Sequence, residues 1–203
     1  MSTLTMTAKP PKRQVIDAFR LRRFSTDEYH KMIESGILTA NARVELLEGW
    51  IIKKMSQNPP HAGSVCRINR WLGRCLPDAW SFRCQSPITL ADSEPEPDFT
   101  LARGEQGTYD CRHPGPSDIG IVLEVADSTL LADRRYKGTL YANEKIPEFW
   151  LINLVKRKIE VYTKPRGGKY GKKVEYAETD AVPLILDGVK VADVSVAELM
   201  AKM

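Results

Sequence analysis

Apolar residues recur at two different spacings along the chain, and these spacings predict where helices and strands lie. Val65, Ile68 and Leu72 stand three and four positions apart, which is typical of a helix with one buried face. Ser25 and Glu28 have the spacing of a capping box, which marks the start of another helix. We predict helices at residues 25–35, 61–76, 129–145 and from about residue 195 to the end.

The remaining apolar segments are shorter and lack the helical spacing, which is typical of strands. We predict strands at residues 50–55, 79–84, 88–90, 99–102, 121–126, 149–153, 158–163, 173–177 and 183–186. Residues 43–48 are predicted as a short acidic turn, 103–118 as a polar loop, and 167–168 and 187–188 as tight turns. This mixture predicts one α+β or α/β domain with a mixed central sheet at residues 24–203, after a flexible basic arm at residues 1–23.

The composition fits one globular domain of 203 residues, of which 42% are hydrophobic. No apolar run of about eighteen residues exists, which excludes a membrane-spanning helix, and no export signal is visible. The cysteines at positions 66, 75, 84 and 111 form no C-x-x-C pair, which argues against a zinc site. We therefore expect a cytoplasmic protein with reduced thiols.

The chain is mildly basic, with a net charge of +4 and a pI near 8.8. This balance permits binding to nucleic acid without requiring it. Much of the basic excess lies in two stretches, residues 9–23 and 156–173. Such a stretch either contacts phosphates or forms an ordinary solvated surface, and the sequence leaves both interpretations open.

Glu124 lies inside the apolar strand predicted at residues 121–126. Because side chains alternate along a strand, Val122, Glu124 and Ala126 should point to the same side of the sheet. Burying a lone carboxylate costs about several kcal/mol, so Glu124 must be protonated, paired with a basic residue or bound to a cation. The strand by itself does not decide between a structural salt bridge and a metal ligand.

Asp98 favours the metal interpretation. It follows Pro97 and begins the strand at residues 99–102, and proline restricts the backbone of its neighbours, so Asp98 should have a defined position. Two carboxylates at strand positions of one sheet can converge on one cation, and magnesium often uses one or two carboxylates with water and phosphate. Such a site beside a lysine suits hydrolysis of a phosphodiester.

A lysine could come from the helix that follows Glu124. Asp133, Lys137 and Tyr141 are four residues apart, so they share one helix face. From this face Lys137 can reach the space above Ala126, whose methyl group leaves room for the ammonium. The alternative is a solvent-exposed pair of Asp133 and Lys137, worth only about a few tenths of a kcal/mol.

These features together resemble the Uma-type restriction endonuclease family, a bacterial branch of the nuclease superfamily known by its PD-(D/E)XK motif. The matching stretches are residues 44–52, 59–61, 97–98, 121–128 and 146–153. Four single positions also match: Met55, Asp133, Lys137 and Tyr141. Their order and spacing cover about residues 25–200. The sequence departs from the motif at Ala126, where the superfamily normally carries its lysine.

The resemblance implies a restriction-endonuclease-like core, a mixed sheet flanked by helices. It implies Asp98 and Glu124 as ligands of Mg²⁺ or Mn²⁺, and Lys137 as a displaced catalytic lysine. Glu45 matches an acidic position that could complete the metal shell through water, or it is an exposed helix residue. His61 matches a histidine that contacts phosphate or substrate, or is structural, and Tyr141 is expected beside the substrate.

Three functions remain open at this point. The first is a metal-dependent endonuclease that hydrolyses DNA with a metal-activated water. The second is a nucleic-acid-binding or regulatory protein that has lost catalysis, an alternative that the missing lysine supports. The third is a structural subunit that dimerises through its C-terminal strands and helix. A nuclease that cuts both strands is expected to be a homodimer or a higher homo-oligomer.

Overall fold

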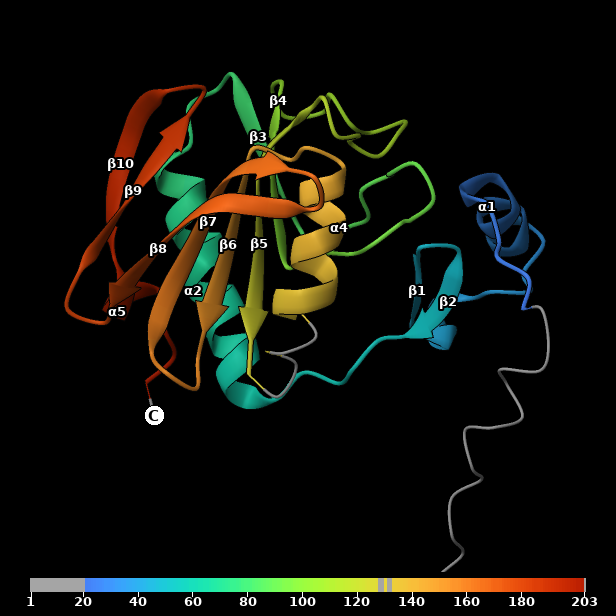
Figure 1. Cartoon of the computed structure of the whole chain (residues 1–203), viewed down its shortest axis with the longest axis horizontal. Helices are drawn as coiled ribbons and strands as arrows, with labels where there is room; N and C mark the ends of the chain where they lie inside the picture. Colours follow the sequence, from blue (N-terminus) through green and yellow to red (C-terminus); the bar gives the residue numbers. More distant parts are fainter. Residues whose placement is uncertain (1–20, 128–129, 131–132, 203) are drawn as a thin grey trace, which may run out of the picture.

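A six-stranded mixed β-sheet forms the centre of the protein, whose computed structural model describes residues 21–127, 130 and 133–202 (Figure 1). In spatial order its strands are β3 (Trp80–Cys84), β4 (Phe99–Arg103), β5 (Ile119–Ala126), β6 (Glu148–Asn153), β7 (Lys158–Arg166) and β8 (Lys169–Ala177). Only β5 and β6 run parallel; the other neighbouring pairs in this sheet are antiparallel. A parallel pair needs a crossover connection, and the segment between β5 and β6 supplies it.

Helices cover both faces of this sheet (Figure 1). Helix α2 (Pro59–Cys75) packs Val65, Ile68 and Leu72 against one face. A π-helical turn, η3 (Asp133–Lys137), leads into helix α4 (Gly138–Asn143), which packs on the opposite face. The alternation along β5 separates the two cores, because Leu123 and Val125 face α2 while Val122 and Ala126 face α4.

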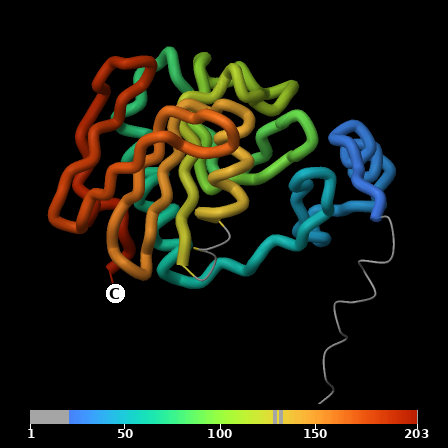
Figure 2. Tube along the Cα trace, in the orientation of Figure 1, coloured from blue at the N-terminus to red at the C-terminus, as the bar shows by residue number. Residues whose placement is uncertain are grey.

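Two hairpins flank the central sheet. In the blue to teal part of the trace, helix α1 (Thr26–Glu34), the short 3-10 helix η2 (Ala40–Ala42) and strands β1 (Val44–Leu47) and β2 (Trp50–Lys53) lie together at one side of the molecule (Figure 2). At the other end of the chain, β9 (Ala181–Leu186) and β10 (Val189–Ser195) form a hairpin that leads into α5 (Val196–Leu199), which contacts α2.

Many elements match the sequence prediction. Ser25 and Glu28 form both hydrogen bonds of the predicted capping box at α1. The paired strands predicted at 149–153 and 158–163 are β6 and β7, and a mixed sheet flanked by helices is confirmed. In the described part of the chain, no helix is long and apolar enough to cross a membrane. The predicted arm at 1–23 lies outside the described residues except for 21–23.

Several local predictions are wrong. Residues 43–48 are not an acidic turn, because Glu45 and Leu46 are buried in strand β1, which pairs with β2. Residues 88–90 are not a strand, because Ile88 and Leu90 donate backbone hydrogen bonds within their own loop, to Pro95 and Ser93. The predicted turn at 187–188 joins two paired strands, but the second of them, β10, was not assigned from the sequence, because a register shift between Lys190 and Ala192 interrupts its alternation.

Candidate functional site

A cavity of about 760 Å³ lies between strand β2 and the end of the central sheet. Strands β1 and β2 form one wall, and the π-helical turn η3 with the start of α4 forms another. The candidate residues that line it are Glu45, His61, Asp98, Glu124 and Lys137, which are far apart in the sequence. The remaining candidate, Tyr141, lies behind the cavity wall and contacts Glu124.

Asp98 directly precedes β4 and is held by three donors. The backbone N–H of Val125 donates to Oδ2 at 2.8 Å, His61 Nε2 donates to the same oxygen at 3.2 Å, and Gln85 donates to Oδ1 at 3.2 Å. Burial alone would raise the pKa of Asp98, but His61, Val125 and Gln85 outweigh it and lower this pKa. Asp98 is therefore a fixed, ionised carboxylate on the cavity wall.

Glu124 is 3% exposed and stands on the α4 side of β5, as the strand alternation predicts. Tyr141 donates a hydrogen bond to its Oε1 at 2.6 Å, and Lys137 Nζ lies 3.0 Å from the same oxygen. Burial raises the pKa of Glu124 to about 8; Lys137 opposes this shift, and the charges of Asp133 and Asp98 add to it. Burial therefore favours the neutral form of Glu124 more strongly than Lys137 favours the charged form.

Lys137 comes from the π-helical turn, a form of helix that is frequent at functional sites. Its side chain is 15% exposed, and its ammonium lies 3.0 Å from Glu124 and 3.9 Å from Asp133. Burial disfavours the charged form, but Glu124, Glu45 and Asp133 outweigh it and raise the pKa of Lys137. The pair of Asp133 and Lys137 is therefore not the solvent-exposed pair considered from the sequence.

Glu45 and His61 are tied to the walls of the cavity. Glu45 is buried on β1, and its Oε2 accepts a hydrogen bond from the backbone N–H of Glu96 at 3.1 Å. The possibility that Glu45 is an exposed helix residue is thus wrong. The ring of His61 contacts Asp98, and its Nδ1 is buried without a partner among the described residues. A contact of His61 or Tyr141 with substrate stays a prediction.

Sequence reasoning missed several residues in or beside the cavity. Gln85 holds Asp98 from a left-handed backbone position just after β3, which no local pattern indicated. Asn58 caps α2 and donates to Asp127, and both line the cavity. Glu96, also on the wall, pairs with Lys54. The run Glu-Pro-Glu-Pro-Asp at residues 94–98 was the one signal that could have pointed to Glu96.

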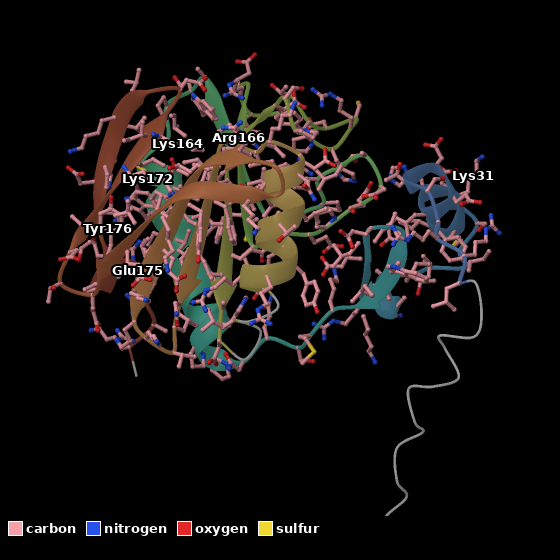
Figure 3. All side chains as sticks on the ribbon, in the orientation of Figure 1. Lys31, Lys164, Arg166, Lys172, Glu175 and Tyr176 are labelled. Carbon is pink, nitrogen blue, oxygen red and sulfur yellow. The ribbon has the colours of Figure 1, made fainter. Side chains whose placement is uncertain are left out.

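The basic stretch at residues 156–173 does not converge on this cavity. Lys158 and Lys173 both pair with Glu175 on β8. On β7, Thr163 pairs with Glu148 at the start of β6, and Lys164 and Arg166 lie beyond this pair (Figure 3). Strand β5 ends at Ala126, which pairs with Asn153 at the other end of β6. These observations favour a solvated surface for this stretch.

The donor set of the cavity fits a hard divalent cation. Asp98 and Glu124 offer carboxylate oxygens, and Glu45 and Asp133 add buried negative charge. Within residues 21–127, 130 and 133–202, no three His, Cys, Asp or Glu side chains are grouped as a metal site. Magnesium requires no such group, because it often uses one or two carboxylates and keeps its waters.

A family model described as "Putative restriction endonuclease" matches residues 26–195, which is most of the chain. The chain therefore belongs to the Uma2 family. All candidate residues of the Uma2 chain named above fall inside the matched segment. None of the curated proteins matches it.

A solved structure supports the same fold for this Uma2 chain. It is described as a putative nuclease belonging to DUF820 from Anabaena variabilis, and it superposes with a TM-score of 0.59. The match covers 87% of this chain and 97% of the Anabaena chain at 15% sequence identity. At this identity the likeness concerns the fold alone, and it confirms the mixed sheet with few helices.

Proposed function

We propose that this Uma2 chain is a metal-dependent endonuclease that hydrolyses phosphodiester bonds in DNA. The observation that carries the proposal is the meeting of Asp98, Glu124 and Lys137 in one cavity, with the ammonium 3.0 Å from Glu124. Asp98 and Glu124 are the residues that would hold Mg²⁺ or Mn²⁺. Bound there, the ion would polarise the phosphate and lower the pKa of the attacking water.

The chain's own residues provide position and charge. Three donors fix Asp98, and Tyr141 fixes Glu124, so neither carboxylate needs to reorganise when substrate arrives. Lys137 stays protonated, and its ammonium would stabilise the negative charge that develops on the phosphate. Lys137 would thus take the role of the superfamily lysine, although it comes from a helix and the superfamily lysine comes from the strand position that Ala126 occupies here.

Plasmid nicking tests this function. We expect the wild-type protein to nick supercoiled plasmid with Mg²⁺ or Mn²⁺ and not with EDTA. Asp98→Ala and Lys137→Ala should each reduce the rate by on the order of 100-fold, because each removes a charge that acts on the transition state. Lys172→Ala on β8, far from the cavity (Figure 3), is the matched control and should cut at the wild-type rate.

Two outcomes would contradict the proposal. Equal nicking by Asp98→Ala and wild type would point to a contaminating nuclease. DNA binding without metal-dependent nicking would favour the nucleic-acid-binding protein without catalysis. A homodimer or higher homo-oligomer remains the expected assembly.

A further inference from the structure

The rim of the cavity carries an unusual amount of exposed apolar surface for a charged site. Tyr136 is 73% exposed, Met55 67% and Ile52 42%, and all three line the cavity. They come from both sides, since Ile52 and Met55 lie on and after β2 while Tyr136 belongs to η3. Exposed apolar side chains gathered at one place indicate a surface that binds something.

Trp50 extends this apolar rim along β2. The guanidinium of Arg23 lies 5.8 Å from the centre of the Trp50 ring, and Arg23 itself does not line the cavity. Trp50 lines the cavity beside Ile52, two positions along β2. Aromatic rings in such positions are stacking platforms for bases, because every base has a π-face.

Basic side chains stand beside the aromatic ones. Lys53 and Arg135 line the cavity from opposite walls and are exposed. Within the described part of the chain, neither forms an ion pair, whereas Lys54 is paired with Glu96 and Lys137 with Glu124. Lys53 and Arg135 are thus available to phosphates that flank a reacting phosphodiester.

The depth of the site distinguishes between paired and unpaired DNA. Glu124 and Asp98 line the cavity but are only 3% and 7% exposed, so a stacked duplex on the surface reaches little of either carboxylate. The volume of about 760 Å³ lies within the range of pockets that take compact ligands. An unpaired nucleotide can leave its neighbours and enter such a space, as bases do in enzymes that act on extruded nucleotides.

We propose that the cavity receives an unpaired segment of DNA, with bases stacked on Tyr136 and Trp50 and flanking phosphates on Lys53 and Arg135. This inference rests on the proposed function, because it takes a phosphodiester as the group that reaches Asp98 and Glu124. It adds the substrate class: single-stranded DNA or a single-stranded stretch within a duplex.

Fluorescence anisotropy with Ca²⁺ in place of Mg²⁺ tests the inference through binding, because a cation must offset the buried carboxylates before a phosphodiester can reach them. The probes are a fluorescein-labelled 12-nucleotide single strand of mixed sequence and the same strand annealed to its complement. We expect the wild-type protein to bind the single strand at least tenfold more tightly. Tyr136→Ala should raise the Kd for the single strand roughly tenfold, because it removes one stacking contact. Tyr136→Phe should keep wild-type affinity, since the ring remains.

Val189→Ala is the matched control, because Val189 is also an exposed apolar residue, 66% exposed, but lies on β10 away from the cavity. The Val189→Ala variant should bind the labelled single strand with the same Kd as the wild type. Duplex binding as tight as single-strand binding, or an unchanged Kd for Tyr136→Ala, would overturn the inference. A loss of dimer in Tyr136→Ala by analytical ultracentrifugation, with unchanged DNA binding, would also overturn it and assign the rim to a second copy of the chain.

Failure of this inference is distinguishable from failure of the proposed function. Single-strand binding that depends on Tyr136, without metal-dependent nicking, would support the inference as a binding site and reject the nuclease. Metal-dependent nicking of duplex plasmid that needs Lys137 but not Tyr136 would keep the nuclease and reject the unpaired substrate.

Discussion

At the scale of single residues, the chemistry of the site depends on how each carboxylate is held. Asp98 receives its donors from three different parts of the chain, and Glu124 receives one from α4. Tyr141 is fully buried, so its hydroxyl has no access to solvent and serves Glu124. A buried hydroxyl bonded to a carboxylate is one of the stronger hydrogen bonds in a protein.

Replacing Tyr141 by phenylalanine tests this contact. At pH 9, above the Glu124 pKa of about 8, we expect Tyr141→Phe to lower the free energy of unfolding by roughly 2 kcal/mol, because the ionised Glu124 loses a charge-assisted hydrogen bond in a dry environment. Tyr170→Phe is the matched control and should cost only about 1 kcal/mol, since its hydroxyl bonds the neutral carbonyl of Ile146. Urea unfolding measures both, and equal losses would show that Tyr141 does not act through the charge of Glu124.

At the scale of elements, the π-helical turn η3 decides where Lys137 stands. Arg134 from this turn pairs with Glu160, which is buried on β7 and also accepts from Tyr162 and Asn153. This ion pair ties η3 to strand β7 of the central sheet. Burial alone would raise the pKa of Glu160, but Arg134, Tyr162 and Asn153 outweigh it and lower this pKa.

The stability of this tie should depend on pH. The pKa of Glu160 is lower in the folded state than in the unfolded state, where it is near 4.5. The ionised Glu160 therefore stabilises the fold above pH 4.5, and this contribution is lost as the pH falls through the folded-state pKa. Glu160→Gln should cost roughly 2 kcal/mol at pH 7 and less below pH 4. Glu175→Gln, on the exposed neighbouring strand, should cost at most about 0.5 kcal/mol at pH 7. Urea unfolding at both pH values measures this, and a cost for Glu160→Gln that is independent of pH would contradict it.

At the scale of the whole molecule, the cavity exists because the segment with α1, β1 and β2 is held beside the central sheet. Glu94, 3% exposed in the loop before β4, accepts from His30 of α1 at 2.7 Å and from Thr89 at 3.2 Å. Its backbone also bridges to Leu46 of β1. This contact joins the N-terminal wall of the cavity to the core.

Weakening that contact should loosen the wall without unfolding the sheet. We expect Glu94→Gln to raise amide hydrogen exchange in residues 44–53 about tenfold, because a charge-assisted contact to His30 is lost, with no change in β5 and β6. Asp27→Asn, on the exposed face of α1, is the control and should leave exchange unchanged. Equal exchange in Glu94→Gln and wild type would show that other contacts hold the wall.

Local patterns in the sequence were enough for much of the fold. The capping box at Ser25, the helical spacing in α2 and the alternation around Glu124 all survive in the structure. Each of these patterns involves residues only a few positions apart, whose side-chain directions are set by the geometry of the helix or strand itself. Predictions failed where long-range pairing decides, as for Glu45, which is buried because β1 pairs with β2 and its carboxylate meets Glu96.

The sequence by itself determined that Glu124 stands on the same side of its strand as Val122 and Ala126, and that Asp98 begins a strand. Only the tertiary structure decided that Lys137 reaches Glu124 and that Tyr136 and Trp50 stand over the same cavity. The physical reason is that these contacts between distant residues depend on the order of strands in the sheet, on the crossover from β5 to β6 and on a π-helical turn. None of these leaves a period in the sequence that a local pattern could reveal.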